Sequence, residues 1–385
     1  MEIKEKLVFA LFFAALFSAS CAPTLKRAEL SPDIVASERE KQLHLALSEQ
    51  IAQSNRLSEV SWSLLKAATG FCEKQISFHY GFALHSKSVY AEKFRDTVAA
   101  EFGISDEVSV RYIHPQFPAA QTGLKTGDKI LKVNENNVKG RSIEEVAELI
   151  LNPAAKLKEP SKDISLEDTT FPVYPMPPSG QADPPVPQGP PPTLNLEIDR
   201  GGQVIPIKVE GVKACKYRVL YVESDVVNAF ADGQNIMFTS GMLRFANSDS
   251  ELALVIGHEI AHNALGHIDM KRVNSIPGLI LDLAIAVVGI NTHGLFTQLA
   301  GNAFSQDFEA EADYMGLYIL AKSGADISHA ADFWRRLGAT HPGSINTQMN
   351  ASHPSSPERF VAIEKHVQEI EEKKARGKPL LPEKK

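Results

Sequence analysis

The residues with the clearest chemical potential are two histidines and a glutamate in one short run. His258, Glu259 and His262 form the pattern H-E-x-x-H within an apolar, proline-free stretch that we expect to be helical. Four residues advance a helix by about 400°, so the two histidines project from one face, one turn apart. Zinc suits two neutral imidazoles, and Glu259 could accept a proton from water whose pKa the metal lowers to about 7. The spacing therefore indicates a zinc site on this helix.

A third histidine, His267, follows this motif at a spacing that does not suit a metal ligand. In the three-histidine zinc peptidases called metzincins, a glycine lies three residues and a histidine six residues after the second ligand. Here Gly266 and His267 stand four and five residues after His262. We therefore expect His267 to pack or to form hydrogen bonds, and we expect the third ligand to come from elsewhere in the chain.

An acidic run at residues 305–313 offers that ligand. If the run is helical, Glu309 and Asp313 share one face, whereas Glu311 lies about 200° around the helix from Glu309 and points away. We predict Glu309 as the third ligand. Asp313, one turn further on, is placed to accept a hydrogen bond from the second ring nitrogen of a zinc-bound histidine, which fixes the histidine tautomer. A solvated helix face is the alternative for such a run.

The elements that must position these residues lie on the amino-terminal side of the motif as well. Residues 31–66 have apolar positions at helical spacing, which predicts one or two helices. Short β-type runs with turn residues follow, and Ser142 and Glu145 form a capping box ahead of an amphipathic helix. Residues 159–193 are rich in proline, which favours neither helix nor sheet. The run 194–209 has the pattern of a β-hairpin.

One stretch of this β-type region, residues 118–134, contains Gly123 and Gly127 and resembles the most recognisable part of PDZ domains. With the capped helix and the hairpin, the resemblance spans residues 105–212. The family implies a groove between a strand and that helix, in which an extended peptide or a chain carboxyl terminus adds as a further strand. A module that only spaces or shields its neighbour is the open alternative. Gly81 could belong to this groove or to the catalytic core.

Five short motifs stand out in the second half of the chain. They are Asn228-Ala-Phe, Ile236-Met-Phe-Thr-Ser-Gly-Met-Leu, His258-Glu-Ile-Ala-His, Glu309-Ala-Glu-Ala-Asp, and Ser352-His-Pro with Arg359. Together they resemble the gluzincin metallopeptidases that include CAAX prenyl proteases, HtpX, mitochondrial Oma-type proteases and periplasmic BepA-like proteins. The match covers residues 217–367, and the PDZ-like insert ahead of it resembles a bacterial lipoprotein subgroup. Gln306 departs from the arginine usual at this position, which leaves the charge partner of Glu309 open.

The resemblance implies a zinc endopeptidase whose substrate lies as an added strand along the edge of a small sheet. It also implies that His353 sits near the zinc, where it either donates a hydrogen bond to the oxyanion or closes the fourth metal position until a substrate arrives. Arg359, like Asp313, is expected to support the ligands without binding the metal itself. The implied edge strand consists of Ile236, Met237, Phe238 and Thr239.

The amino terminus has the layout of an export signal. Lys4 and Lys6 precede the unbroken apolar run 7–17, and small residues lead into Cys21. Cys21 resembles the acylated cysteine of a bacterial lipobox, so we expect a lipid anchor; cleavage by an ordinary signal peptidase, which leaves a soluble exported protein, is the alternative. Neither the run 7–17 nor the apolar run 279–290 reaches the roughly 20 residues of a membrane-spanning helix. We expect residues 279–290 to form a buried or active-site-covering helix, with a helix that dips into the membrane as the alternative.

Composition sets further bounds. The chain has 385 residues and is 43% hydrophobic, which predicts two or three folded units. Its net charge of -7 argues against nucleic acid as a partner. If Cys21 is lipidated, Cys72 and Cys215 remain as an even pair in an oxidising compartment. We therefore predict a disulfide between them, with two separate buried thiols as the alternative.

These observations predict an α+β fold, with a mainly helical zinc metallopeptidase core, a small edge sheet and an inserted PDZ-like β domain. The predicted function is a zinc endopeptidase with one Zn²⁺ per chain, acting on misfolded or misassembled proteins of the bacterial cell envelope. A chaperone-like protein that holds clients while proteolysis is latent is the alternative. Expected partners are extended or unfolded polypeptides, a peptide or C-terminal ligand of the PDZ-like domain, and the outer membrane through the lipid anchor.

The expected segments are a signal peptide (1–20), N-terminal helices and the start of the core (21–104), the PDZ-like domain (105–212) with a disordered insert (159–193), the catalytic domain (213–367) and a charged tail (368–385).

Overall fold

The computed structural model describes residues 28–72, 75–151, 190–270, 305–340 and 356–384. Cys21, the apolar run 279–290, His353 and most of the proline-rich stretch therefore lie outside the described residues. Within the described part, no helix combines the length and apolarity needed to cross a bilayer. The chain divides into two compact units, residues 1–46 and residues 47–385.

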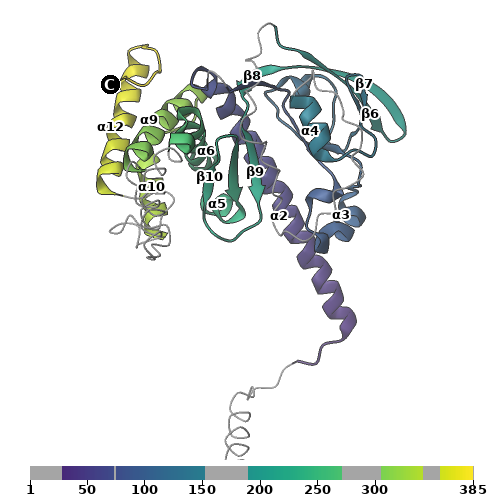
Figure 1. Ribbon diagram of the computed structural model, residues 1–385. Helices are drawn as coiled ribbons and strands as arrows, with labels where there is room; N and C mark the ends of the chain where they lie inside the picture. The colour runs from purple at the N-terminus through teal and green to yellow at the C-terminus, as the bar shows by residue number, and fades with distance from the viewer. Residues whose placement is uncertain (1–27, 73–74, 152–189, 271–304, 341–355, 385) are drawn as a thin grey trace, which may run out of the picture. The chain divides into compact units, whose positions relative to one another are not determined.

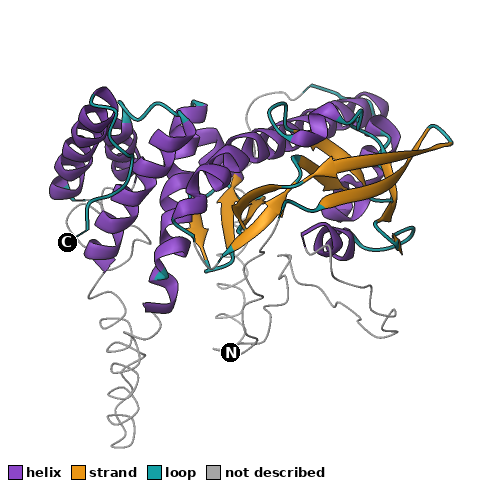
Figure 2. Ribbon diagram, turned by 90° about the horizontal axis from the view of Figure 1, so that it is seen from above, coloured by secondary structure: helices purple, strands orange, loops and turns teal. Residues whose placement is uncertain are grey.

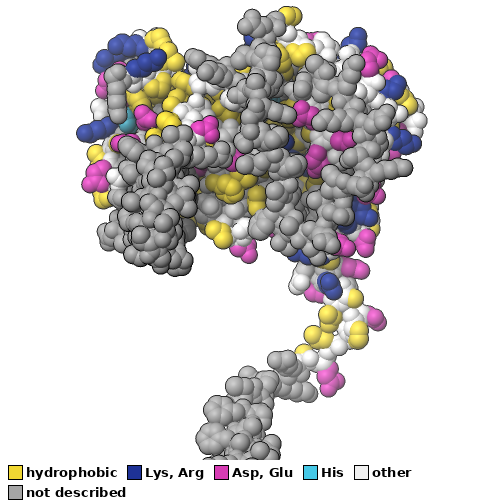
Figure 3. Space-filling model, viewed as in Figure 1, with side chains coloured by type: hydrophobic (Ala, Val, Ile, Leu, Met, Phe, Trp, Pro, Cys, Tyr) yellow, Lys and Arg dark blue, Asp and Glu magenta, His cyan; other side chains and the backbone are white. Residues whose placement is uncertain are grey.

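A single long helix, α2 (Pro32–Ala67), forms where one or two helices were expected over residues 31–66. On its first turns, apolar side chains such as Ile34 are exposed and interspersed with charged ones (Figure 3). Further along, Leu57 and Leu64 are buried in the same core as the helices that carry the metal-ligand motifs. The second half of α2 is therefore part of the catalytic core.

A six-stranded antiparallel sheet occupies the region that resembles a PDZ domain (Figure 1). Its order is β2-β3-β4-β6-β7, with β5 paired to β4, and its first strand lies ahead of residue 105, the expected start of the domain. β6 and β7 form the long hairpin that the sequence predicts (Figure 2). The strands are β2 (Phe82–His85), β3 (Ser109–Ile113), β4 (Lys129–Val133), β5 (Asn136–Asn137), β6 (Thr193–Arg200) and β7 (Gln203–Glu210), with a short helix α3 (Arg95–Phe102) between β2 and β3.

Helix α4 (Ile143–Leu151) packs on this sheet and begins with the predicted capping box. The backbone N–H of Ser142 donates to Glu145 Oε2 at 3.0 Å, and the N–H of Glu145 donates to Ser142 Oγ at 3.3 Å. These two bonds satisfy backbone donors that the first helical turn leaves unpaired. The helix then buries Val146 in one core with strand residues such as Ile198.

Gly81 lies directly before β2 and therefore belongs to the PDZ-like sheet, which decides between the two placements that the sequence left open. Its φ is 85°, and a Cβ atom at this position would lie 2.1 Å from Phe117 Cβ. Its carbonyl accepts a hydrogen bond from the His114 N–H at 2.8 Å. Only glycine fits here, because a side chain meets both a strained backbone and an occupied space.

Two further strands close the inserted domain at its ends. β1 (Ile76–His79) pairs in antiparallel fashion with β8 (Val212–Cys215). Cys72 and Cys215 are joined by a disulfide whose Cα atoms lie 5.9 Å apart, which confirms the predicted pairing. Both cysteines are buried in the core that contains the catalytic helices. The chain therefore leaves this core and returns to it at one covalently closed point.

A three-stranded sheet follows the insertion. Its central strand is β11 (Asn235–Thr239), which pairs in antiparallel fashion with β10 (Ala229–Ala231) and in parallel fashion with β9 (Arg218–Val222). β9 precedes β10 in the chain, yet it lies on the far side of β11. Within the described residues, the edges of this sheet are therefore β10 and β9.

The prediction of a substrate edge at residues 236–239 is wrong for this reason. Both sides of that strand are already paired within the sheet, so its backbone groups are used in strand pairing. The edge next to the helix with the H-E-x-x-H motif is β10, in the Asn228-Ala-Phe motif. The residues predicted at the edge that instead lie in the central strand are Ile236, Met237, Phe238 and Thr239.

Besides the second half of α2, the catalytic core contains, among the described residues, α5 (Ser240–Phe245), α6 (Asp249–Leu265), α9 (Ser305–Ser323), α10 (Ala330–Thr340) and α12 (Pro357–Ala375). α6 contains the H-E-x-x-H motif, as predicted. It begins at Ser248, whose Oγ accepts the Glu251 N–H at 3.2 Å, and it ends at Gly266, whose φ is 70°. All residues from 252 to 263 are buried, which explains the apolar run around the motif.

Arg56 on α2 fixes the connection between α5 and α6. Its Nη1 donates to the carbonyls of Leu243 and Ala246 at 3.1 and 2.9 Å, and its Nε donates to Asp249 Oδ1 at 2.7 Å. The two carbonyls belong to the end of α5, where backbone acceptors have no partner within the helix. α2 thereby holds the start of the helix with the H-E-x-x-H motif in place.

The carboxyl-terminal residues continue the helical core beyond the expected boundary at residue 368. α12 runs through this boundary to Ala375, and the chain after it returns along α9. The Glu383 N–H donates to the Tyr314 hydroxyl at 3.0 Å, and Lys373 Nζ donates to the Leu381 carbonyl at 3.0 Å. The charges of the tail thus serve helix packing.

We predict that replacing Cys72 and Cys215 together with serine destabilises the full chain. The disulfide spans a sequence separation of 143 residues. Chain entropy for a loop of that length gives up to about 5 kcal/mol of stabilisation. Denaturant unfolding of both proteins, each without reductant, measures the difference. An unchanged unfolding midpoint, or two free thiols on alkylation of the unreduced, denatured wild type, would contradict the prediction.

Candidate metal centre

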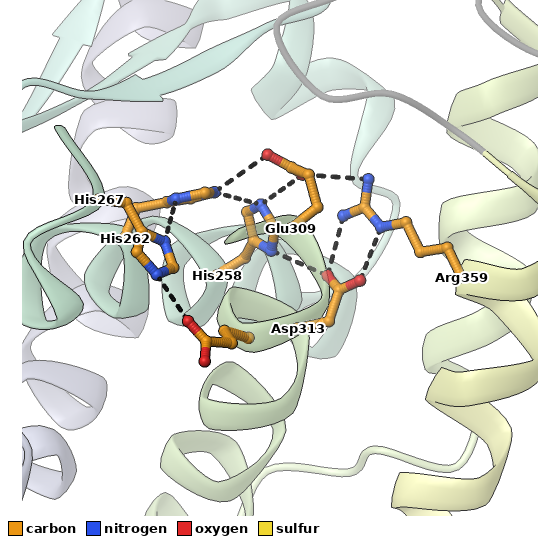
Figure 4. A network of polar contacts seen from close by, with 7 residues as sticks. His258, His262, His267, Glu309, Asp313 and Arg359 are labelled. Carbon is orange, nitrogen blue, oxygen red and sulfur yellow. Dashed lines mark hydrogen bonds and ion pairs between the residues drawn. The ribbon is translucent and has the colours of Figure 1, made fainter. Parts of the chain in front are cut away.

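α6 and α9 bring three buried donor groups to one point (Figure 4). The Nε2 atoms of His258 and His262 lie 3.0 Å apart. Glu309 Oε2 lies 3.3 Å from His258 Nε2, and Glu309 Oε1 lies 3.3 Å from His262 Nε2. The structure therefore assembles the three residues that the sequence predicts as ligands.

The spacing of these atoms fits a zinc ion. Zinc bonds to nitrogen and oxygen at about 2.0–2.2 Å, so ligands at tetrahedral corners lie about 3.3 Å from one another. The three measured separations are 3.0, 3.3 and 3.3 Å. Two imidazoles and one carboxylate are also a donor set that zinc accepts in sites that leave one position for water or substrate. The residues present therefore fit the metal, whose presence remains a prediction.

A glycine-to-glycine contact sets the distance between the two helices that carry the ligands. A Cβ atom at Gly316 of α9 would lie 3.1 Å from both Gly257 C and His258 N of α6. One at Gly257 would lie 3.2 Å from the Gly316 carbonyl oxygen and 2.3 Å from a methyl group of Leu320. Because neither residue has a side chain, the two backbones approach directly beside the first ligand.

The same face of α9 carries the contact and the acids. Glu309, Asp313 and Gly316 follow the spacing i, i+4, i+7, which places them in one stripe of the helix. The contact at Gly316 therefore presents both carboxylates toward α6. Asp313 Oδ1 lies 2.9 Å from His258 Nδ1, which is the contact predicted from helical spacing. A carboxylate in this position favours the tautomer that leaves Nε2 free for metal.

Arg359 at the start of α12 pairs with both carboxylates. It donates to Asp313 from Nε at 2.6 Å and from Nη2 at 2.9 Å, and its Nη1 lies 3.2 Å from Glu309 Oε2. Gln306, which stands where relatives usually have an arginine, is exposed. A charge partner of Glu309 is instead Arg359. The guanidinium also lies over the ring of Trp334, at 4.7 Å.

The electrostatics of the cluster favour a positive charge at His258 but not at His262, whose pKa is lowered by burial. Burial disfavours a charged imidazole, but hydrogen bonds and charges from Asp313 and Glu309 outweigh it and raise the pKa of His258 to about 9. Burial also acts to raise the pKa of Asp313, yet Arg359 outweighs it and the pKa lies below its usual value. Asp313 therefore stays ionised, and the site is prepared for a cation.

Three residues outside the predicted ligand set, His267, Glu311 and Trp334, lie close to the ligands. His267 Nδ1 lies 3.0 Å from His262 Nδ1, and its Nε2 lies 3.4 Å from Glu311 Oε2. The ring of Trp334 lies 5.0 Å from the ring of His258. His267 forms hydrogen bonds instead of joining the three donors, as expected. Helical spacing places Glu311 away from the donors but gives no signal that it meets His267.

Comparison with known proteins adds the family. Residues 195–367 match the sequence pattern of Peptidase family M48, and residues 109–159 match that of a PDZ domain. The M48 match covers all three donor residues and Arg359. The resemblance drawn from the five motifs is thereby confirmed. By structure, the β6–β7 hairpin at the start of the M48 match completes the PDZ sheet.

Relatives of the M48 region include proteases from organelles and bacteria. The mitochondrial metalloendopeptidase OMA1 of Arabidopsis thaliana is 34% identical over 39% of this chain and 31% of its own length. OMA1 of Homo sapiens is 27% identical over 41% and 34%, and the beta-barrel assembly-enhancing protease of Yersinia pestis is 29% identical over 44% and 38%. The matched M48 region thus spans about a third of each of these relatives. A solved HtrA3 PDZ domain with a phage-derived ligand is 15% identical over 36% of this chain and 88% of its own, at a TM-score of 0.21.

We predict that Glu309→Ala strongly reduces zinc bound to the M48 domain, because it removes one of three protein donors. His258→Ala and His262→Ala should have the same effect. Zinc per folded chain, measured by elemental analysis after gel filtration, tests this. Asp307→Ala, at an exposed acid on the same helix, is the matched control and should keep wild-type zinc. Full zinc occupancy in Glu309→Ala would mean that the third ligand lies elsewhere.

A second prediction concerns the helix contact. Gly316→Ala adds a methyl group 3.1 Å from the backbone of α6, so α9 must shift. Such overpacking costs about 1–3 kcal/mol of folding stability, and the shift moves Glu309 relative to the histidines. We therefore expect weaker zinc binding as well as a lower unfolding midpoint. Ala310→Met, at an exposed position of α9, adds volume without touching α6 and should leave both quantities unchanged. Equal zinc affinity in wild type and Gly316→Ala would contradict this account.

Proposed function

We propose that this protein is a zinc-dependent endopeptidase of the bacterial cell envelope that cleaves misfolded or misassembled envelope proteins. The observation that carries the proposal is the convergence of His258, His262 and Glu309 beside Glu259 in a domain of peptidase family M48. The relatives of this domain are named as metalloendopeptidases and as a beta-barrel assembly-enhancing protease. These names support the reaction class more directly than they support the substrate.

The chemistry follows from the residues around the three donors. Zinc held there would supply a Lewis acid that acidifies water and polarises the scissile carbonyl. Glu259 adjoins His258 on α6 and is buried, with 2% of its surface exposed. We assign to its carboxylate the role of accepting a proton from the attacking water and passing that proton to the leaving amine. Peptide hydrolysis needs both transfers, and one carboxylate can perform them in turn.

The edge strand β10 offers a place for an extended substrate. Asn228 and Thr239 form a hydrogen-bonded pair, because the Thr239 N–H donates to the Asn228 carbonyl at 3.2 Å. In an antiparallel ladder, alternate residues turn their backbone groups outward, so Ala229 and Ala231 direct theirs away from β11. Ala229 is buried, whereas Ala231 is partly exposed. A substrate strand that pairs with Ala231 can bind through its backbone, whatever its sequence. This suits a protease that acts on unfolded chains.

Asn263 ties this edge to the metal-binding helix. It follows His262 on α6, and its Oδ1 accepts the Gly233 N–H at 2.8 Å while its Nδ2 donates to the Asn235 carbonyl at 3.3 Å. Both partners lie in or beside the turn that joins β10 to β11. The substrate edge and the second histidine are thereby held in a fixed relation.

Location and further partners are proposed from the sequence. The signal-like amino terminus and Cys21 support export and a lipid anchor in the outer membrane, and the Cys72–Cys215 disulfide suits an oxidising compartment. The PDZ domain supports binding of an extended peptide or a chain carboxyl terminus. His353, outside the described residues, keeps its proposed role as oxyanion donor or as latch on the fourth metal position.

We predict that Glu259→Gln retains zinc and loses proteolysis, because it removes only the proton acceptor. Cleavage of a casein-type unfolded substrate and zinc content are measured on the same preparations of wild type and variant. Removing a general base typically lowers turnover by about 10²–10⁴-fold. Turnover of Glu259→Gln equal to wild type would overturn the assignment of the base. Client binding by a zinc-loaded wild type that cleaves nothing would instead favour the chaperone-like function.

A further inference from the structure

We propose that His267 is a positioning residue for the metal centre, holding the ring of His262 through a hydrogen-bonded chain that ends at Glu311. The proposal rests on the proposed function, because it requires a metal at His258, His262 and Glu309. His267 is not itself a ligand in this proposal. Its part is to fix the orientation and tautomer of a ligand.

The contacts form a continuous line of polar atoms (Figure 4). His262 Nδ1 and His267 Nδ1 lie 3.0 Å apart, and His267 Nε2 lies 3.4 Å from Glu311 Oε2. His267 is buried, with 2% of its surface exposed, whereas half of the Glu311 side chain is exposed. The line therefore leads from the buried ligand to an acid at the surface.

Proton positions follow from metal binding. His262 can offer a lone pair from Nε2 only if its single ring proton is on Nδ1. That proton faces His267 Nδ1, which must then act as the acceptor. His267 consequently carries its own proton on Nε2, where it faces the Glu311 carboxylate. Each donor meets an acceptor, so one set of tautomers satisfies all three groups.

The turn after α6 makes this contact possible. Gly266 ends the helix with a φ of 70°, a left-handed conformation that suits glycine. This turn brings His267 beside His262, where the two ring centroids lie 5.1 Å apart. Had α6 continued as a regular helix, residues five apart would point to different faces. His267, whose spacing does not suit a metal ligand, thus contacts the Nδ1 side of the predicted ligand His262.

α9 completes the setting of His267. The ring of Phe308 stacks on that of His267, with centroids 4.6 Å apart and an interplanar angle of 18°. Phe308 directly precedes Glu309, so the helix that supplies the third ligand also supplies the stacking surface and the terminal acid. His267 is therefore held by the same two helices that form the metal site.

The two histidine ligands are supported in different ways. His258 contacts a buried carboxylate directly, because Asp313 Oδ1 lies 2.9 Å from its Nδ1. On its Nδ1 side, His262 is linked to the Glu311 carboxylate through a second imidazole, that of His267. Partners of this kind raise the basicity of the ligand and hold its ring in place. The chain thus gives both ligands an acceptor on the side away from the metal.

Zinc affinity of the full chain, measured by competition with a chromogenic chelator, tests the proposal. His267→Leu removes the acceptor while it keeps an apolar side chain of similar size. Loss of such a partner typically weakens metal binding by about 10–100-fold, which is the change we expect. His267→Asn can present its Oδ1 near the position of Nδ1, so it should bind zinc more tightly than His267→Leu. The visible spectrum of the Co²⁺-loaded protein should change in His267→Leu, since the ligand geometry is altered.

Glu311→Ala and Asp307→Ala form a matched pair, because both remove an acid from α9. Glu311→Ala should weaken zinc binding by a smaller factor than His267→Leu, and Asp307→Ala should not weaken it. If His267→Leu fails to fold, the zinc affinity of Glu311→Ala tests the positioning role, because Glu311 is half exposed. Wild-type zinc affinity in a folded His267→Leu, or in Glu311→Ala, would refute the positioning role while leaving the zinc site intact. A wild type that binds no zinc would instead refute the proposed function, and this inference with it.

Discussion

The direct contact between α6 and α9 at Gly257 and Gly316 is the constraint on which the site depends. One helix carries both histidines, and the other carries the carboxylate that completes the donor set. Their separation is set by backbone atoms, which cannot change rotamer as side chains can. Because α9 presents its acids on the stripe that includes Gly316, one contact fixes the ligand and its supporting aspartate together. Apolar packing alone would tolerate a wider range of separations.

Burying these charged groups destabilises the folded protein unless their charges are balanced. Glu309 and Asp313 are both buried, and isolated carboxylates in such surroundings carry a large desolvation cost. Arg359 offsets this cost by pairing with both, and it comes from a third helix that is distant in sequence. The guanidinium therefore joins α12 to the crossing of α6 and α9. The charge balance and the helix packing of the centre depend on each other.

The site residues that the sequence predicts correctly are those decided within one helix, whereas the Cys72–Cys215 disulfide was predicted from the number of cysteines and the compartment. The positions of His258, His262, Glu309 and Asp313 follow from helical periodicity, which needs only residues a few places apart. The prediction of the edge strand was wrong because β9 pairs directly with β11, although β10 lies between them in the sequence. No residue in 218–222 signals that partner. The contact of His267 with Glu311 depends on how the chain returns after α6, which periodicity does not determine. Non-local pairing thus accounts for both failures.

The closed ends of the inserted domain have a topological consequence. Cys72 and Cys215 place the exit and the re-entry of the chain 5.9 Å apart, and the pairing of β1 with β8 continues from that point. Because the chain leaves and re-enters the core at one point, the connections between the strands and helices of the core do not depend on the length of the inserted chain. The inserted domain can therefore be lengthened or exchanged during evolution without changing those connections.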